Sequence, residues 1–212
     1  MSFGILGKKI GMTQIFDLKG NAVPVTIVNS GPCFISQIKT NENSGYIAVQ
    51  LAFSEIYLNN KSLTKPLRGH FEKSNIKYYR YLKEFKVKNS LKFKLGQKIS
   101  LSLFNVGEYV NAKALTIGKG NASNIKKNKF KRGPMSHGSK HHRLQGSLGA
   151  GTSPGRVFPG KKMPGRLGSI NCTIKNLEIL LIDKINNFLI IKGSIPGKRG
   201  SLVKLSATKE NL

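Results

Sequence analysis

Three histidines lie close together in the segment RGPMSHGSKHHR at residues 132–143, and imidazole groups so spaced could bind a metal ion or transfer protons. A zinc site needs three or four convergent ligands, and only the distant Cys172 could join His137, His141 and His142. The spacing of His137 and His141 would bring them together on a helix, but the surrounding glycines disfavour one. We therefore predict no metal site.

Catalysis and nucleotide binding find no better support. A catalytic histidine needs a group that orients its ring, and the sequence has no Asp or Glu between Glu108 and Glu178. No activating pattern surrounds the nearby serines. The stretch GKGNAS at 118–123 is only a fragment of a phosphate-binding loop, which requires a preceding strand and a Gly-Lys-Ser/Thr triplet that opens a helix. We expect no catalytic residue, no cofactor and no small-molecule substrate, apart from Mg²⁺ ions that a bound partner could carry.

Positive charge dominates the composition. The chain has 36 Lys and Arg against nine Asp and Glu, a formal net charge of +27 over 212 residues. Such a chain repels itself, so a polyanion is the expected partner: nucleic acid first, an anionic membrane surface or acidic polysaccharide second. No run of 18 apolar residues occurs, and we expect no membrane partner.

The segment at 119–168, called the insert here, combines Gly, Pro and cations in a pattern typical of RNA contact. Glycine allows close approach of backbone N–H groups to phosphates, Lys and Arg neutralise phosphates, and His and Arg planes stack on bases. A disordered cationic loop with incidental glycines is the alternative. The predicted RNA contacts are Lys8 and Lys9 of the N-terminal GKKIG, and Lys119, Lys126, Lys127, Lys129, Lys131, Arg132, His137, Lys140, His141, His142, Arg143, Arg156, Lys161, Lys162 and Arg166 of the insert.

The remainder of the chain must position this insert, and its pattern is that of short strands. Alternating apolar residues with β-branched and aromatic types, separated by Gly, Pro and Asn, predict a mainly β fold built on a small antiparallel β-barrel with a long irregular basic loop insertion. Cys33 and Cys172 lie in apolar strand-like runs and are expected to be small core residues. The predicted elements are strands at 5–6 and 12–16 flanking a basic turn GKKIG, a hairpin turn at 17–21, strands at 22–30, 33–40 and 45–53, strand patterning over 98–120, a hairpin over 176–197 turning at DKINN, and a strand at 202–207.

The predicted organisation is a β-barrel domain at 1–118 plus 169–212 and an extended finger at 119–168. A less regular helix and loop segment occupies about 54–95. Basic and aromatic residues alternate there, which suits RNA contact. The alternative is a surface whose aromatic residues belong to the core, and we favour this one. The aromatic residues concerned are Phe71, Tyr78, Tyr79, Tyr81 and Phe85.

Several motifs together resemble the large-subunit ribosomal protein L-three family in its bacterial and plastid form. They are GILGKKIGMTQIF near the start, GKG at 118–120, RGPMSHGSKHHR at 132–143, GSLGAGTSPGRVFPGKKMPGRLG at 146–168 and IKGSIPG at 191–197. The resemblance implies a translation-protein-like barrel and a finger that enters the large-subunit rRNA toward the peptidyl transferase centre, with its tip around 149–153. It also implies an early role in subunit assembly, with rRNA and neighbouring large-subunit proteins as partners.

Two other function classes would each need a pattern of their own. An RNA-modifying enzyme using the histidines would need a carboxylate or a cofactor loop beside them, and a membrane-surface or nucleoid-coating protein would need an amphipathic basic helix or a repetitive Lys/Ala tail. The sequence has neither pattern. The expected location is the ribosome of the plastid (chloroplast) stroma, with the bacterial cytoplasm as the alternative.

Overall fold

The computed structural model describes residues 3–56 and 63–208. Part of the predicted helix and loop segment, residues 57–62, lies outside the described residues. The chain divides into two compact units, one of Met1–Leu115 with Asn171–Leu212 and one of Thr116–Ile170. The second unit is called the finger below.

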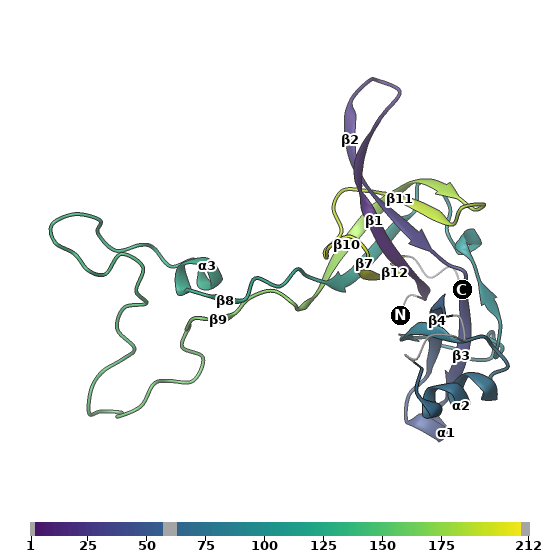
Figure 1. The fold of residues 1–212 in the computed structure, drawn as a ribbon, viewed down its shortest axis with the longest axis horizontal. Coiled ribbons are helices and arrows are strands. Elements are labelled where there is room, and N and C mark those ends of the chain that lie inside the picture. Colours follow the sequence, from purple (N-terminus) through teal and green to yellow (C-terminus); the bar gives the residue numbers. More distant parts are fainter. Residues whose placement is uncertain (1–2, 57–62, 209–212) are drawn as a thin grey trace. The chain divides into compact units, whose positions relative to one another are not determined.

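Six antiparallel strands of the first unit pair in a closed ring. In order around the ring they are β1 (Gly4–Phe16), β12 (Leu202–Ala207), β7 (Tyr109–Leu115), β10 (Asn171–Asp183), β11 (Phe188–Lys192) and β2 (Ala22–Ser30) (Figure 1). Alternation of buried and half-buried residues along β12 matches the period of two expected of a strand with one face in the core. The mainly β prediction is confirmed.

Both predicted hairpin turns form, and an aspartate stabilises each. Asp17 accepts hydrogen bonds from the backbone N–H groups of Lys19 (2.9 Å) and Asn21 (2.8 Å), between β1 and β2. Asp183 does the same for Ile185 and Asn186 between β10 and β11. Such local side-chain to backbone bonds are the reason that aspartate favours turns.

The turn predicted at GKKIG is wrong. Residues 4–16 form one strand, because β12 pairs with it up to Lys8 and β2 pairs with it from Gly7 to Phe16. The glycines and lysines mark a β-bulge between Lys9 and Gly11 rather than a chain reversal. A bulge of this kind bends a strand without ending it.

A second sheet in this unit has the strand order β5-β4-β3-β6. Its elements are β3 (Cys33–Lys39), β4 (Ala48–Glu55), β5 (Tyr79–Lys86) and β6 (Lys98–Ile99), with helices α1 (Asn41–Ser44) and α2 (Lys65–Lys73) and a 3-10 turn at Leu101–Leu103. The strand patterning predicted over 98–120 is therefore interrupted by this turn before β7 begins.

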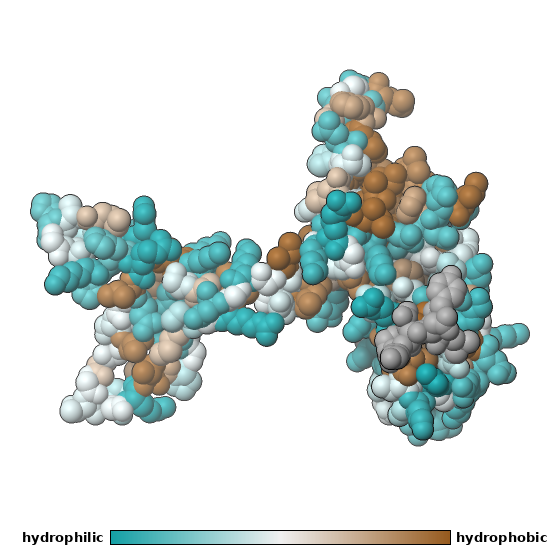
Figure 2. Space-filling model, in the orientation of Figure 1, coloured by the Kyte–Doolittle hydropathy of each residue, from teal (hydrophilic) through white to brown (hydrophobic). Residues whose placement is uncertain are grey.

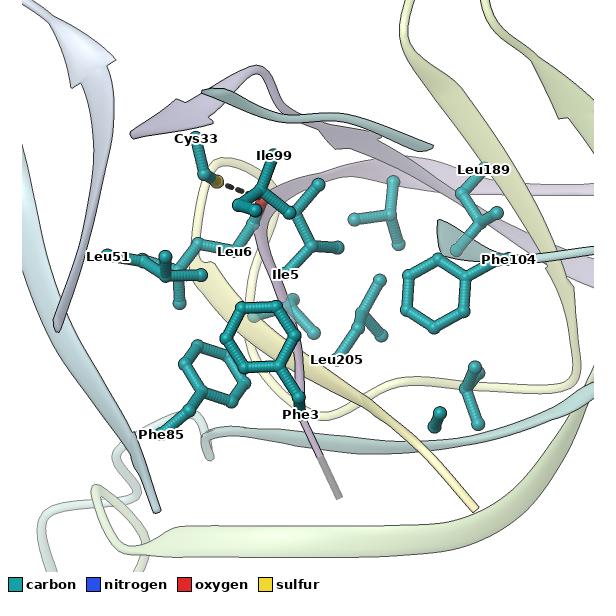
Figure 3. Close-up of a cluster of buried hydrophobic side chains, with 14 of the residues drawn as sticks. Phe3, Ile5, Leu6, Cys33, Leu51, Phe85, Ile99, Phe104, Leu189 and Leu205 are labelled. Atoms are coloured by element: carbon teal, nitrogen blue, oxygen red, sulfur yellow. Dashed lines mark hydrogen bonds between the residues drawn. The ribbon is translucent and has the colours of Figure 1, made fainter. Parts of the chain in front are cut away.

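One apolar cluster fills the barrel and continues under the second sheet. Figure 3 shows Leu205 and Leu189 beside Phe104, Ile5 beside Ile99, and Phe3 beside Phe85 of β5. Cys33 is fully buried, as predicted, whereas Cys172 is only half-buried. Of the aromatic residues at 71–85, Phe71, Tyr79 and Phe85 are buried, which confirms the core interpretation for these three.

The finger has little regular structure. It contains a two-stranded ribbon of β8 (Asn121–Ala122) and β9 (Gly165–Arg166), and the short helix α3 (Asn124–Asn128) directly follows β8. All of its residues are described, and Ala122 and Asn124 are the only buried ones. Figure 1 draws the rest of the finger as irregular loops beyond α3. Burial this small offsets little of the entropy cost of ordering a segment of this length, so the order of the finger depends on hydrogen bonds more than on an apolar core.

Candidate nucleic-acid interface

The finger begins and ends in a narrow backbone ladder. Thr116 N–H donates to Ile170 O (2.9 Å), Lys119 N–H to Leu167 O (2.9 Å), and Leu167 N–H to Gly120 O (3.0 Å). Gly168, at φ +76°, allows the two strands to approach, because a Cβ there would lie 2.2 Å from Ile117 O. The ladder holds the two ends of the finger together.

Beyond the ladder, two asparagines of α3 connect three stretches of chain. Asn124 is 2% exposed, and its Nδ2 donates to Lys162 O (3.1 Å) and to Gln145 Oε1 (3.4 Å). Asn128 Nδ2 donates to Asn124 Oδ1 (2.7 Å) and to Met163 O (3.2 Å). We call Asn124, Asn128 and Gln145 the amide cluster. It provides by hydrogen bonds the cohesion that an apolar core would otherwise provide.

Sequence reasoning missed the amide cluster. Asparagine and glutamine carry no charge and are common in loops, so their residue types alone do not mark these three as structural. The one available signal is NIKKN at 124–128, where two asparagines four residues apart would share a helix face.

The three histidines belong to a loop closed at its base. Gly133 N–H donates to His142 O (3.3 Å), and His142 Nδ1 donates to Pro134 O (3.0 Å). A Cβ at Gly133 would lie 2.3 Å from His141 O, so the close approach requires glycine. His137 and His141 are exposed. Among the described residues, no group of three His, Cys, Asp or Glu side chains is placed to hold a metal ion.

Every lysine and arginine of the finger is exposed. The twelve are Lys119, Lys126, Lys127, Lys129, Lys131, Arg132, Lys140, Arg143, Arg156, Lys161, Lys162 and Arg166. The finger contains no Asp or Glu, because all nine acidic residues lie outside 116–170. No carboxylate of its own can therefore neutralise these cations, and its surface in Figure 2 is mainly hydrophilic or neutral.

One exposed aromatic ring lies among these cations and was also missed. Phe158 is 58% exposed, and the guanidinium of Arg156 lies 5.9 Å from its ring centroid. An exposed ring next to arginine can stack on a nucleobase. The signal that could have found it is an aromatic residue in a basic loop that has too few apolar residues to bury a ring.

The two N-terminal candidates, both in the first unit, differ sharply. Lys8 is half-buried, with Nζ 3.5 Å from Ser54 Oγ and 5.7 Å from the Tyr81 ring centroid. Lys9 is buried, and its Nζ donates to Ile195 O (2.6 Å) and Gly197 O (3.3 Å). Burial lowers the pKa of Lys9. The prediction of Lys9 as an RNA contact is corrected here, because its ammonium is occupied inside the protein.

No helix among residues 3–56 and 63–208 is long and apolar enough to cross a membrane.

Comparison with known proteins gives one consistent family. The family model described as ribosomal protein L3 matches residues 83–187. The chain is 49% identical over 209 residues to the large ribosomal subunit protein uL3 of Thermosynechococcus vestitus, covering 99% of this chain and 98% of the relative. It is 50% identical to that of Trichormus variabilis, with 99% of both covered. For Carboxydothermus hydrogenoformans the identity is 52% over 203 residues, with 96% of both covered.

Proposed function

The chain belongs to the ribosomal protein L3 family, and on that basis we propose that it is a structural component of the large ribosomal subunit that binds large-subunit rRNA through its finger. The observation that carries the proposal is the set of twelve exposed cations on a unit without carboxylates and almost without a core. Relatives in this family are large ribosomal subunit proteins by name, and the chain is not an enzyme.

The binding mechanism follows from these features. Lys and Arg of the finger would neutralise phosphates and release condensed counterions, which makes affinity fall steeply with salt. Backbone N–H groups at the glycines would approach phosphates closely, and Phe158, Arg143 and the exposed histidines would stack on unpaired bases. The amide cluster would present the loops in a partly ordered form, which reduces the entropy that binding must overcome.

The proposed contacts are the predicted ones without Lys9, with Phe158 added. The first unit would lie at the subunit surface, its closed ring corresponding to the translation-protein-like barrel that the family resemblance implies. The finger, with its tip around 149–153, would extend toward the peptidyl transferase centre, and binding would take place early in assembly beside neighbouring large-subunit proteins. The proposed location is a plastid ribosome, with a bacterial ribosome as the alternative, and the cyanobacterial relatives fit both.

A salt titration of rRNA binding tests this proposal. Replacing Lys161, Lys162 and Arg166 by Ala removes three exposed cations of the finger. If each contacts a phosphate, the log–log salt slope becomes shallower by about 2–3, at roughly 0.7–0.9 per contact. Near 0.1 M salt the same loss weakens binding on the order of 100-fold or more.

The matched control removes the same charge from the first unit. Three exposed lysines serve for this: Lys19, Lys92 and Lys184. Replacing them by Ala is expected to change the log–log salt slope by less than the roughly 0.7–0.9 that one phosphate contact contributes. The proposal would be contradicted by equal salt slopes for the finger variant and the unchanged chain, or by equal losses of rRNA affinity in the finger variant and the control variant.

A further inference from the structure

A surface recess opens beside the amide cluster, within the finger. Its volume is about 520 Å³, in the range of roughly 300–1,000 Å³ that is typical of small-ligand sites. Three separate stretches line it: Ser123 with Asn124 at the start of α3, residues 141 and 143–147, and Pro164. Asn124 fixes their spacing through its bonds to Gln145 Oε1 and Lys162 O. The recess is thus held open by hydrogen bonds.

The lining groups are those that recognise a flat heterocycle attached to an anion. Leu144, 60% exposed, and Pro164 present apolar surface. His141 and Arg143 present exposed planar groups, of which Arg143 is a permanent cation. Gln145 Oε1 accepts a hydrogen bond from Asn124 Nδ2, and Gln145 Nε2 donates to no group among the described residues. A ligand would therefore meet an amide donor between apolar and planar walls.

We propose that this recess takes a single unstacked nucleobase of the rRNA, with Gln145 Nε2 donating to an acceptor on the base and Arg143 meeting the adjoining phosphate. The proposal rests on the function proposed above and adds to it a defined nucleotide. RNA is favoured over a peptide because the recess lies among twelve cations without a carboxylate to bind a peptide's basic groups. Splayed-out bases stacked on side chains and hydrogen-bonded on their edges are the usual mode of specific RNA recognition.

Photo-crosslinking in large-subunit particles that carry the full chain tests the proposal. A diazirine side chain of similar size replaces Leu144, and a matched control carries it at Leu148, which is exposed on the same finger but does not line the recess. We expect the probe at 144 to crosslink to one unpaired nucleotide. Crosslinks at 144 to duplex nucleotides or to protein overturn the proposal.

The control separates this proposal from the broader one. A probe at 148 that reaches rRNA while the probe at 144 does not refutes the recess and leaves rRNA binding standing. Failure of both probes to reach rRNA refutes both.

A second variant examines the hydrogen bond itself. Gln145→Glu keeps the acceptor that Asn124 uses, removes the donor and places a negative charge beside the phosphate. At the crosslinked nucleotide, we expect reactivity toward base- and ribose-modifying reagents to rise by roughly 5–30-fold, in particles that still assemble. Unchanged reactivity at that nucleotide contradicts the assigned contact.

Discussion

Replacing Asn124 by Ala should loosen the finger without affecting the barrel. Asn124 is 2% exposed and takes part in three side-chain hydrogen bonds, with Lys162 O (3.1 Å), Gln145 Oε1 (3.4 Å) and Asn128 Nδ2 (2.7 Å). Few apolar contacts replace them, because Ala122 is the only other buried residue of the finger. The amide cluster should therefore determine how often this region opens.

The magnitude follows from the two shorter bonds. A hydrogen bond contributes about 0.5–1.5 kcal/mol net, so losing two costs about 1–3 kcal/mol of local stability. At about 1.4 kcal/mol per tenfold, this increases the population of the open state by roughly 5–150-fold. The amides of Lys127, bonded to Ser123 O, and Phe130, bonded to Asn124 O, should exchange with solvent faster by that factor.

Native-state hydrogen exchange on the isolated chain, followed by NMR, measures this change. Asn121→Ala is the control, because Asn121 is an exposed asparagine of the neighbouring ribbon. Exchange at Lys127 and Phe130 that matches the unchanged chain would show that the amide cluster does not hold the finger. Faster exchange of the barrel amide of Lys9, bonded to Ser201 O, would show that the effect is not local.

Three further outcomes follow from the first unit. Lys9→Ala leaves two carbonyls without their donor and should lower the free energy of unfolding by about 1–3 kcal/mol, whereas exposed Lys19→Ala should change it by less than about 0.5 kcal/mol, as denaturant titration can measure. Burial lowers the pKa of Lys204 to about 8, with repulsion from a nearby lysine adding to the shift. In the unfolded chain this lysine has an ordinary pKa of about 10.4, so between pH 8 and about 10 the unfolded state binds more protons than the folded state and the free energy of unfolding should rise with pH. Lys204→Met should flatten that rise. An identical rise in the variant and the unchanged chain would contradict the assignment. Burial raises the pKa of Cys33 to about 12, so at pH 8 iodoacetamide should alkylate the half-buried Cys172 first. Mass spectrometry of the folded chain can measure the two rates, and equally fast modification of Cys33 would refute this prediction.

Composition and motif order in the sequence were enough to predict the mainly β class, both hairpin turns and the family. A turn residue such as Asp17 accepts hydrogen bonds from backbone groups two to four residues away, so its effect can be predicted from the local sequence without knowledge of the fold. The absence of acid between Glu108 and Glu178 is likewise a property of sequence, and residue types alone therefore argue against acid–base chemistry in the insert.

Tertiary structure decided what each lysine and each amide does. Lys8 and Lys9 are adjacent and chemically identical, yet strand alternation and the bulge after Lys9 leave one half-buried at the surface and bring the other to carbonyls 186 and 188 residues away. The amide cluster likewise joins Asn124 to groups 21 and 38 residues along the chain. Such partners depend on which distant segments of the chain pack together, and a local pattern of residue types carries no information about that packing.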